Sequence, residues 1–173
     1  NILIKRAKTE TLPPGDYGTI KIKKGGKLIL TGGVYNIASL DAARNTKILF
    51  EGPSEVRVEG KVTTGARAYV GPASGSGIQA SDIIFYVAGD NERRWKKNKW
   101  WVKRRVVKFG NRNVVYANVY APNGTIWLRV GSKATGAFIG KSVVVGVNVK
   151  VTLDSFFGAG VMTRVIADAG DAD

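Results

Sequence analysis

The 173-residue sequence contains no cysteine, no histidine, one methionine and five prolines. The absence of cysteine excludes disulfide bonds and thiol nucleophiles, and the absence of histidine excludes every histidine-based catalytic triad. Together the two absences remove the Cys and His ligand sets of structural zinc sites. No stretch approaches the roughly 18 consecutive apolar residues of a membrane-spanning helix. We therefore expect no catalytic triad, no metal site and no cofactor.

Acidic residues are also few: 13 Asp and Glu stand against 27 Lys and Arg, for a net charge of +14. Glycine, with 22 residues, lies well above its usual share of about 7%. The apolar fraction of 44% is enough for a buried core. The composition predicts a basic, ordered chain of one domain.

Apolar and polar residues alternate along short segments, which is the pattern of half-buried β-strands. Residues 143–153 carry six apolar residues in strict alternation, which predicts one face in a core and the other mostly in water. Shorter copies of the pattern lie at 19–23, 55–59 and 126–130. Gly and Pro pairs separate these segments, as expected of tight corners.

The pattern repeats along the chain. Residues 27–33 align with residues 47–53 at an offset of 20, and residues 115–127 align with residues 134–145 at an offset of 18 to 19, with Thr125 opposite Val143. This period predicts an all-β, single-stranded right-handed parallel β-helix of roughly eight coils of about 20 residues. The alternative is an antiparallel sandwich or barrel, which the offset disfavours because it matches a full coil rather than a hairpin.

Changes in composition divide the chain. We expect an N-terminal extension or strand at 1–11, the β-helix at 12–157 and a tail at 158–173. Two segments break the strand pattern inside the β-helix. Residues 71–81 are rich in small residues and predict a loop, and residues 89–105 form a basic, aromatic insertion.

The insertion is the strongest candidate for a binding site, because cations interleaved with aromatic rings suit single-stranded nucleic acid, lipid headgroups or anionic glycans. The alternative is structural: charged residues protect a sheet edge, and Trp with Lys and Arg stems covers a coil. The sequence does not choose between these ligands. The expected polyanion-binding residues are Arg93, Arg94, Trp95, Lys96, Lys97, Lys99, Trp100, Trp101, Lys103, Arg104 and Arg105.

The two ends of the chain suggest assembly. A solenoid exposes an unpaired coil at each end, so each end must be capped or continued by another subunit. A head-to-tail contact that does not close produces a filament. The expected contact residues are Ile2, Leu3, Ile4, Lys5 and Arg6 at one end and Asp168, Asp171 and Asp173 at the other.

Three motifs could indicate nucleotide binding, catalysis by paired carboxylates or glycosylation, but each is better explained by its place in the fold. Residues 136–142 approach a phosphate-binding loop, but the glycine spacing is short and a valine strand follows instead of a helix. The carboxylates are scattered, and Glu55 and Glu59 share one strand face with Arg57 between them, as solvated charges do. Residues 123–125 match a glycosylation pattern, but an Asn-Gly corner accounts for them.

Four segments resemble the repeat domain of uncharacterised bacterial surface proteins: 12–18 (Leu-Pro-Pro-Gly-Asp-Tyr-Gly), 28–35 (Leu-x-Leu-x-Gly-Gly-x-Tyr), 120–125 and 136–141. Those domains are similar to polymer-forming, bactofilin-like right-handed β-helices, and related domains occur in pilus-assembly-associated proteins. The resemblance covers residues 12–157. It implies a fold and a polymer-forming role, and it brings no catalytic residues.

Taken together, these features predict a non-enzymatic structural β-helix at the cell surface or outside the cell, a subunit of a filament, pilus-like polymer or matrix that associates with itself end to end. A binding module for anionic glycan, nucleic acid or a membrane surface, acting through the insertion, is the alternative. A polysaccharide lyase or hydrolase is a third hypothesis, because β-helices host many such enzymes.

Overall fold

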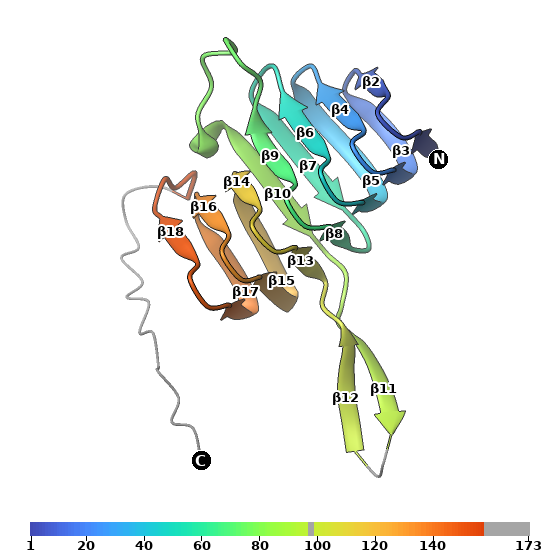
Figure 1. Ribbon diagram of the computed structural model, residues 1–173, viewed down its shortest axis with the longest axis vertical. Coiled ribbons are helices and arrows are strands. Elements are labelled where there is room, and N and C mark those ends of the chain that lie inside the picture. Colours follow the sequence, from blue (N-terminus) through green and yellow to red (C-terminus); the bar gives the residue numbers. More distant parts are fainter. Residues whose placement is uncertain (97–98, 158–173) are drawn as a thin grey trace.

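The computed structural model describes residues 1–96 and 99–157, and between residues 92 and 104 it describes the backbone alone. The chain winds into a parallel β-solenoid of about seven turns (Figure 1). One side is a seven-stranded parallel sheet, here called the back face. Its strands are β2 (Thr9–Leu12), β4 (Lys27–Leu30), β6 (Lys47–Phe50), β9 (Tyr69–Pro72), β14 (Val114–Tyr116), β16 (Lys133–Thr135) and β18 (Lys150–Thr152).

A nine-stranded parallel sheet forms the rest of the wall and bends along a corner into two faces. The front face holds β7, β10 and the first halves of the long strands β3, β5, β15 and β17. The side face holds β1, β8, β13 and the second halves of the same long strands. The strands are β1 (Ile2–Ile4), β3 (Gly15–Ile22), β5 (Gly33–Ala42), β7 (Ser54–Val58), β8 (Val62–Thr64), β10 (Ile83–Val87), β13 (Val107–Phe109), β15 (Asn118–Leu128) and β17 (Phe138–Val145).

The core consists of apolar columns that run along the solenoid axis, one residue from each coil. In the side face, Ile20 lies in register with Leu40, Leu40 with Val62, and all three are buried. Phe50 of the back face meets Phe85 of the front face edge to face, with ring centroids 6.0 Å apart. The predicted parallel β-helix is therefore confirmed, and its interior is filled by side chains.

Each coil turns from the side face to the back face through the same tight corner. The third residue of this turn has a left-handed backbone in every coil, with φ between 55° and 72°. In every coil except the last described one, its N–H donates to a carbonyl of the next coil, as Asn45 does to Ala66 at 2.9 Å. The seven left-handed residues are Ala7, Gly25, Asn45, Arg67, Arg112, Gly131 and Asn148.

The registers confirm the first predicted repeat and correct the second. Lys27 pairs with Lys47, at the predicted offset of 20. Val115 pairs with Ala134, but Ile126 pairs with Val143, so the alignment of Thr125 with Val143 was one residue out. The cause is a corner at residues 122–124 that is two residues longer than its counterpart in the last coil.

The first residues join the solenoid directly. β1 pairs with β3 and β2 pairs with β4, so the segment 1–11 forms the first, partial coil. The number of coils is near seven rather than eight, because two excursions take up the length of one coil. One is the expected loop, which continues into the short 3-10 helix η1 (Ala80–Asp82).

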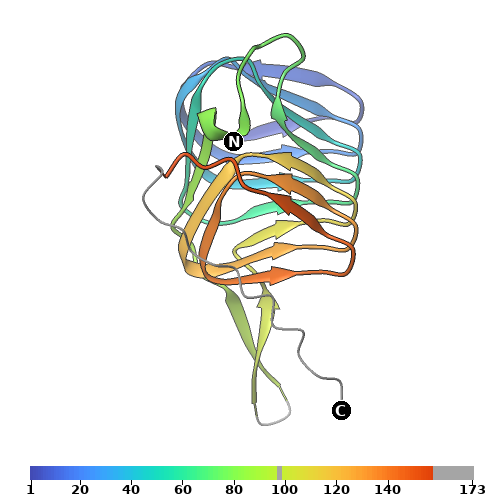
Figure 2. The ribbon, with the colours of Figure 1, turned by 90° about the vertical axis from the view of Figure 1, so that its left-hand side faces the viewer.

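The other excursion is the predicted insertion. β11 (Glu92–Lys96) and β12 (Lys99–Arg104) form an antiparallel two-stranded hairpin outside both solenoid sheets. The hairpin leaves the corner between β10 and β13 and projects away from the solenoid (Figures 1 and 2). At its base, Asn91 accepts hydrogen bonds from the N–H groups of Val106 and Thr125, both at 3.0 Å.

The prediction for residues 143–153 was wrong in its burial. The run is two strands, β17 and β18, joined by the turn that contains Asn148. Both belong to the last described coil, so the alternate residues that face inward have no further coil above them. Val145 and Val151 are each 49% exposed, whereas Ile4 in the first coil is 2% exposed.

Candidate functional site

The structure places nine of the eleven expected polyanion-binding residues on the hairpin strands. Arg93 is the Cα partner of Val102, and Trp95 is the Cα partner of Trp100. Arg94, Lys96, Lys99, Trp101, Lys103 and Arg104 also lie on β11 or β12, and Lys97 lies outside the described residues. The structure thus brings the predicted cations and tryptophans together on two paired strands.

Arg105, the last residue of the predicted set, belongs to the solenoid wall. Its guanidinium carbon lies 3.9 Å from the ring centroid of Trp127, and that of Arg129 lies 5.0 Å from the same centroid. Partial burial lowers the pKa of Arg105 from its ordinary value, yet a guanidinium remains charged in proteins at neutral pH. The two cations rest on the electron-rich ring, so Trp127 anchors a cationic cluster.

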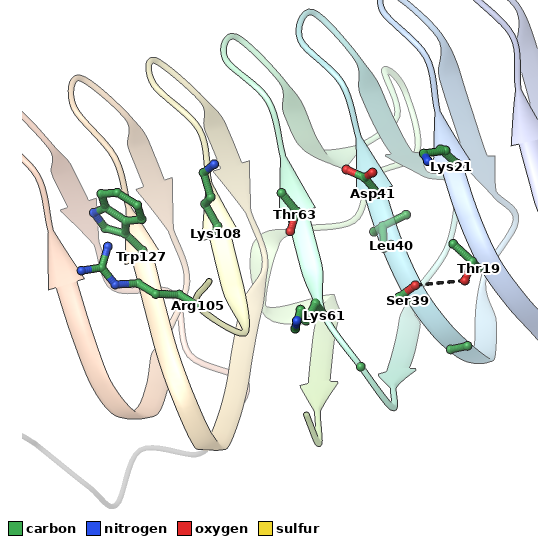
Figure 3. Close-up of a pocket in the computed structure, with 12 residues that line it drawn as sticks. Thr19, Lys21, Ser39, Leu40, Asp41, Lys61, Thr63, Arg105, Lys108 and Trp127 are labelled. Carbon is green, nitrogen blue, oxygen red and sulfur yellow. Dashed lines mark hydrogen bonds between the residues drawn. The ribbon is translucent and has the colours of Figure 1, made fainter. Parts of the chain in front are cut away.

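A groove runs along the side face from this cluster (Figure 3). It encloses about 980 Å³ and crosses β3, β5, β8, β13 and β15. Three lysines and three hydroxyl side chains line it, together with one carboxylate, that of Asp41. The lining residues with polar or charged ends, and Trp127, are Thr19, Lys21, Ser39, Asp41, Lys61, Thr63, Arg105, Lys108 and Trp127.

One outward column of the side face supplies much of this groove. Lys21 pairs with Asp41, Asp41 with Thr63, Thr63 with Lys108, and Lys108 with Trp127. Sequence reasoning missed this column apart from Arg105 nearby. The signal was present, because writing the coils beneath one another at their turns would have aligned these five positions.

Four cations at the groove form no ion pair with a described carboxylate, although Asp41 is the Cα partner of one of them, Lys21. Of the residues with described side chains, none places a carboxylate within 4 Å of the charged groups of Lys21, Arg105, Lys108 or Arg129. Asp41 lies two strands from Lys108, or roughly 10 Å at about 4.8 Å per strand. The groove therefore presents a positive surface with hydroxyl groups along its floor.

The predicted assembly residues fall into three groups. Ile4 is buried, Ile2 is half-buried and Leu3 is 56% exposed. Lys5 and Arg6 are exposed at the first turn, and the acidic residues Asp168, Asp171 and Asp173 lie outside the described residues. Sequence reasoning missed a second exposed apolar surface at the last described coil, formed by Val143, Val145, Val151 and Leu153 with exposures between 41% and 74%.

The carboxylates lie as the structural interpretation predicts. Glu55 forms an ion pair with Arg57, with 2.6 Å between Oε1 and Nε, on the front face. In the part of the chain that the structure describes, no three Asp or Glu residues gather as a metal site would require. The segment 136–142, which approaches a phosphate-binding loop, enters β17 and no helix follows it. At the separate Asn-Gly corner, the side chain of Asn123 donates to the carbonyl of Ala88 at 2.9 Å.

Comparison with known proteins adds no relative: no family model, no curated protein and no solved structure matches this chain. The resemblance to bactofilin-like domains therefore remains a prediction. Among the described residues there is no helix long and apolar enough to cross a membrane.

Proposed function

We propose that this protein is a non-enzymatic structural solenoid, a subunit that associates end to end into a filament or matrix at the cell surface or outside the cell. The observation that carries the proposal is the open last coil. Val143, Val145 and Val151 occupy core positions yet remain 41–49% exposed, and β17 and β18 each have one unpaired edge among the described strands. Exposed strand edges over apolar surface are ready templates for pairing with another chain.

A second copy fits this end because the first and last coils share the same columns. The side-face column begins at Ile2, runs through Ile20 and Ile126, and ends at Val143. A following copy would place its β1 beside β17 and its β2 beside β18, with all strands parallel. Such a heterologous contact does not close, so it continues into a rod.

Charge also favours the head-to-tail arrangement. Lys5, Arg6 and Lys8 are exposed at the first coil. The acidic tail residues Asp168, Asp171 and Asp173 follow the last described coil in sequence. Opposite charges at the two ends would steer copies into one polarity.

The groove favours binding over hydrolysis as its role. Glycosidases use two carboxyl groups about 5–9.5 Å apart, and Asp41 is the one carboxylate among the residues that line the groove. The third hypothesis, a polysaccharide-degrading enzyme, thus has no pair of acids in this groove to support it. Release of reducing ends from an acidic glycan would revive it.

The test compares the full chain with a V145K/V151K variant by sedimentation velocity and negative-stain microscopy across a concentration series. We expect rods of the parent protein and monomers of the variant, because the charge added at position 145 would be buried against Ile4 of the following copy. A matched variant, V34K/V130K, adds the same charges at exposed valines outside the last coil and should assemble like the parent. A parent that stays monomeric, or rods unaffected by V145K/V151K, would contradict the proposal.

The hairpin supports a second role, because it projects from the solenoid and its residues 93–104 include seven cations and three tryptophans. We propose that it contacts polyanions. Binding to heparin or single-stranded DNA over a salt series, with Trp95, Trp100 and Trp101 changed to Ala, tests this role. Unchanged affinity would leave the hairpin as structural cover.

A further inference from the structure

We propose that the side-face groove is a separate binding site for an acidic polysaccharide, a chain that bears carboxylate or sulfate groups. The site is built by the solenoid wall and needs neither the hairpin strands nor the ends of the rod. Its cationic groups are Lys21, Lys61, Arg105 and Lys108, and Arg129 adjoins Trp127 at one end.

The length of the groove points to a polymer. The column from Lys21 to Trp127 crosses five neighbouring strands, or roughly 19 Å at about 4.8 Å per strand. Lys21 lies at one end, Lys108 and Arg105 lie at the other, and Lys61 lies between them (Figure 3). A single small anion could satisfy one end only, whereas a chain with repeated charges satisfies both.

The groups between the cations point to a sugar. Thr19, Ser39 and Thr63 line the groove with hydroxyls, and the Thr19 and Ser39 oxygens lie 3.1 Å apart. Hydroxyls both donate and accept hydrogen bonds, and the Asp41 carboxylate accepts them. Such a floor matches a ligand that is rich in hydroxyl groups and carries intermittent negative charge.

The aromatic residue of the groove disfavours single-stranded nucleic acid. Sequence-tolerant binding of single strands uses open aromatic faces on which bases stack. The guanidinium groups of Arg105 and Arg129 already lie over the Trp127 ring, at 3.9 and 5.0 Å from its centroid. Recognition in this groove thus rests on charge and hydroxyl groups rather than on base stacking.

The test measures binding of polygalacturonate, which carries carboxylates, and of heparin, which carries sulfates, to the full chain in the V145K/V151K background. That background removes avidity from end-to-end association, so a failure here is independent of the assembly proposal. For K21Q/K108Q we expect an affinity for at least one of the two polymers about 10- to 30-fold weaker at low salt, and a shallower dependence on salt.

The matched control is K27Q/K47Q, which removes two exposed lysines that pair on the back face. We expect it to weaken binding less than threefold and both variants to keep the parental melting temperature. If K21Q/K108Q and K27Q/K47Q lost affinity equally, the polymers would be attracted by net charge alone and the proposed site would be wrong. Absence of binding to both polymers would also contradict the proposal. If oligo(dT) bound more tightly than either polysaccharide and K21Q/K108Q abolished that binding, the assignment to a polysaccharide would be wrong and the groove would be a nucleic-acid site.

Discussion

Glu10 is the Cα partner of Leu28, so a carboxylate holds the first place in a back-face column that Leu28 and Ile48 continue with buried side chains. An inward-pointing charge at an edge is a known protection against uncontrolled pairing. The two ends of the solenoid are therefore chemically different: the first coil carries the Glu10 carboxylate at a core position, and the last coil carries exposed valines.

We expect Glu10→Leu to strengthen end-to-end association by about tenfold or more, because a head-to-tail contact would otherwise bury the carboxylate against Val151. Sedimentation velocity of the full chain measures the change. Glu51→Leu, at an exposed turn, controls for added apolar surface and should leave association unchanged. Equal behaviour of the two variants would show that the first coil is not part of the joint.

Asn113 is fully buried and joins three coils. Its Oδ1 accepts from the N–H of Ala68 at 2.9 Å, its amide group donates to Thr64, and its own N–H donates to Ser132 Oγ at 3.2 Å. We expect Asn113→Ala to lower the free energy of unfolding by about 2–3 kcal/mol, because Ala68 N–H loses its acceptor. Urea unfolding measures the loss.

The control for Asn113 is Asn36→Ala. Asn36 makes an exposed hydrogen bond to Asp16 at 2.7 Å. Surface changes of this kind cost under about 0.5 kcal/mol. Similar losses for the two variants would contradict a special role for the buried amide.

The solenoid should not need the hairpin strands. β11 and β12 pair only with each other among the described strands, so replacing residues 92–104 by Gly-Ser-Gly should keep the far-ultraviolet circular dichroism of the solenoid and shift Tm by about 4 °C or less. In the intact chain, Asn91→Ala should cost about 1–3 kcal/mol, because the N–H groups of Val106 and Thr125 lose their acceptor. Collapse of the shortened chain would mean that the hairpin stabilises the wall.

Gly136 lies at a turn where the neighbouring coil leaves no room for a side chain. Its φ is 140°, and a Cβ added there would overlap the carbonyl oxygen of Ala117. We expect Gly136→Ala to cost about 2–4 kcal/mol from strain and overlap with that coil. Gly77→Ala has a positive φ of 72° but open space around it, so it should cost about 1 kcal/mol. Thermal unfolding of both variants separates the two contributions.

The regular part of the fold was predictable because its register is local and repeated. Lys27 and Lys47 begin similar strands after similar turns, so one offset describes both coils. The groove has no constant offset and becomes visible in the sequence only when the coils are aligned at their turns. Lys21, Asp41, Thr63 and Lys108 share a column, but the steps between them are 20, 22 and 45 residues, because the loop at 71–81 and the hairpin both lie within the last step.

The burial of the last coil was unpredictable for another reason. The alternation from Val143 to Leu153 is the same whether or not another coil covers it, and only the stacking order shows that none of the described coils does. The hairpin side chains illustrate a similar limit, because the sequence indicates which charges gather there but not what they contact.

The insertion also shows how such a rod tolerates change. Ile83–Val87 keeps its register with the strands on both sides, and so does Val107–Phe109, although the chain departs from the wall between them. A corner of this solenoid can therefore accept an inserted segment without rearrangement of the interior. Foreign peptides or fluorophores inserted at the equivalent corners of other coils would project from the solenoid at intervals set by the spacing of its strands.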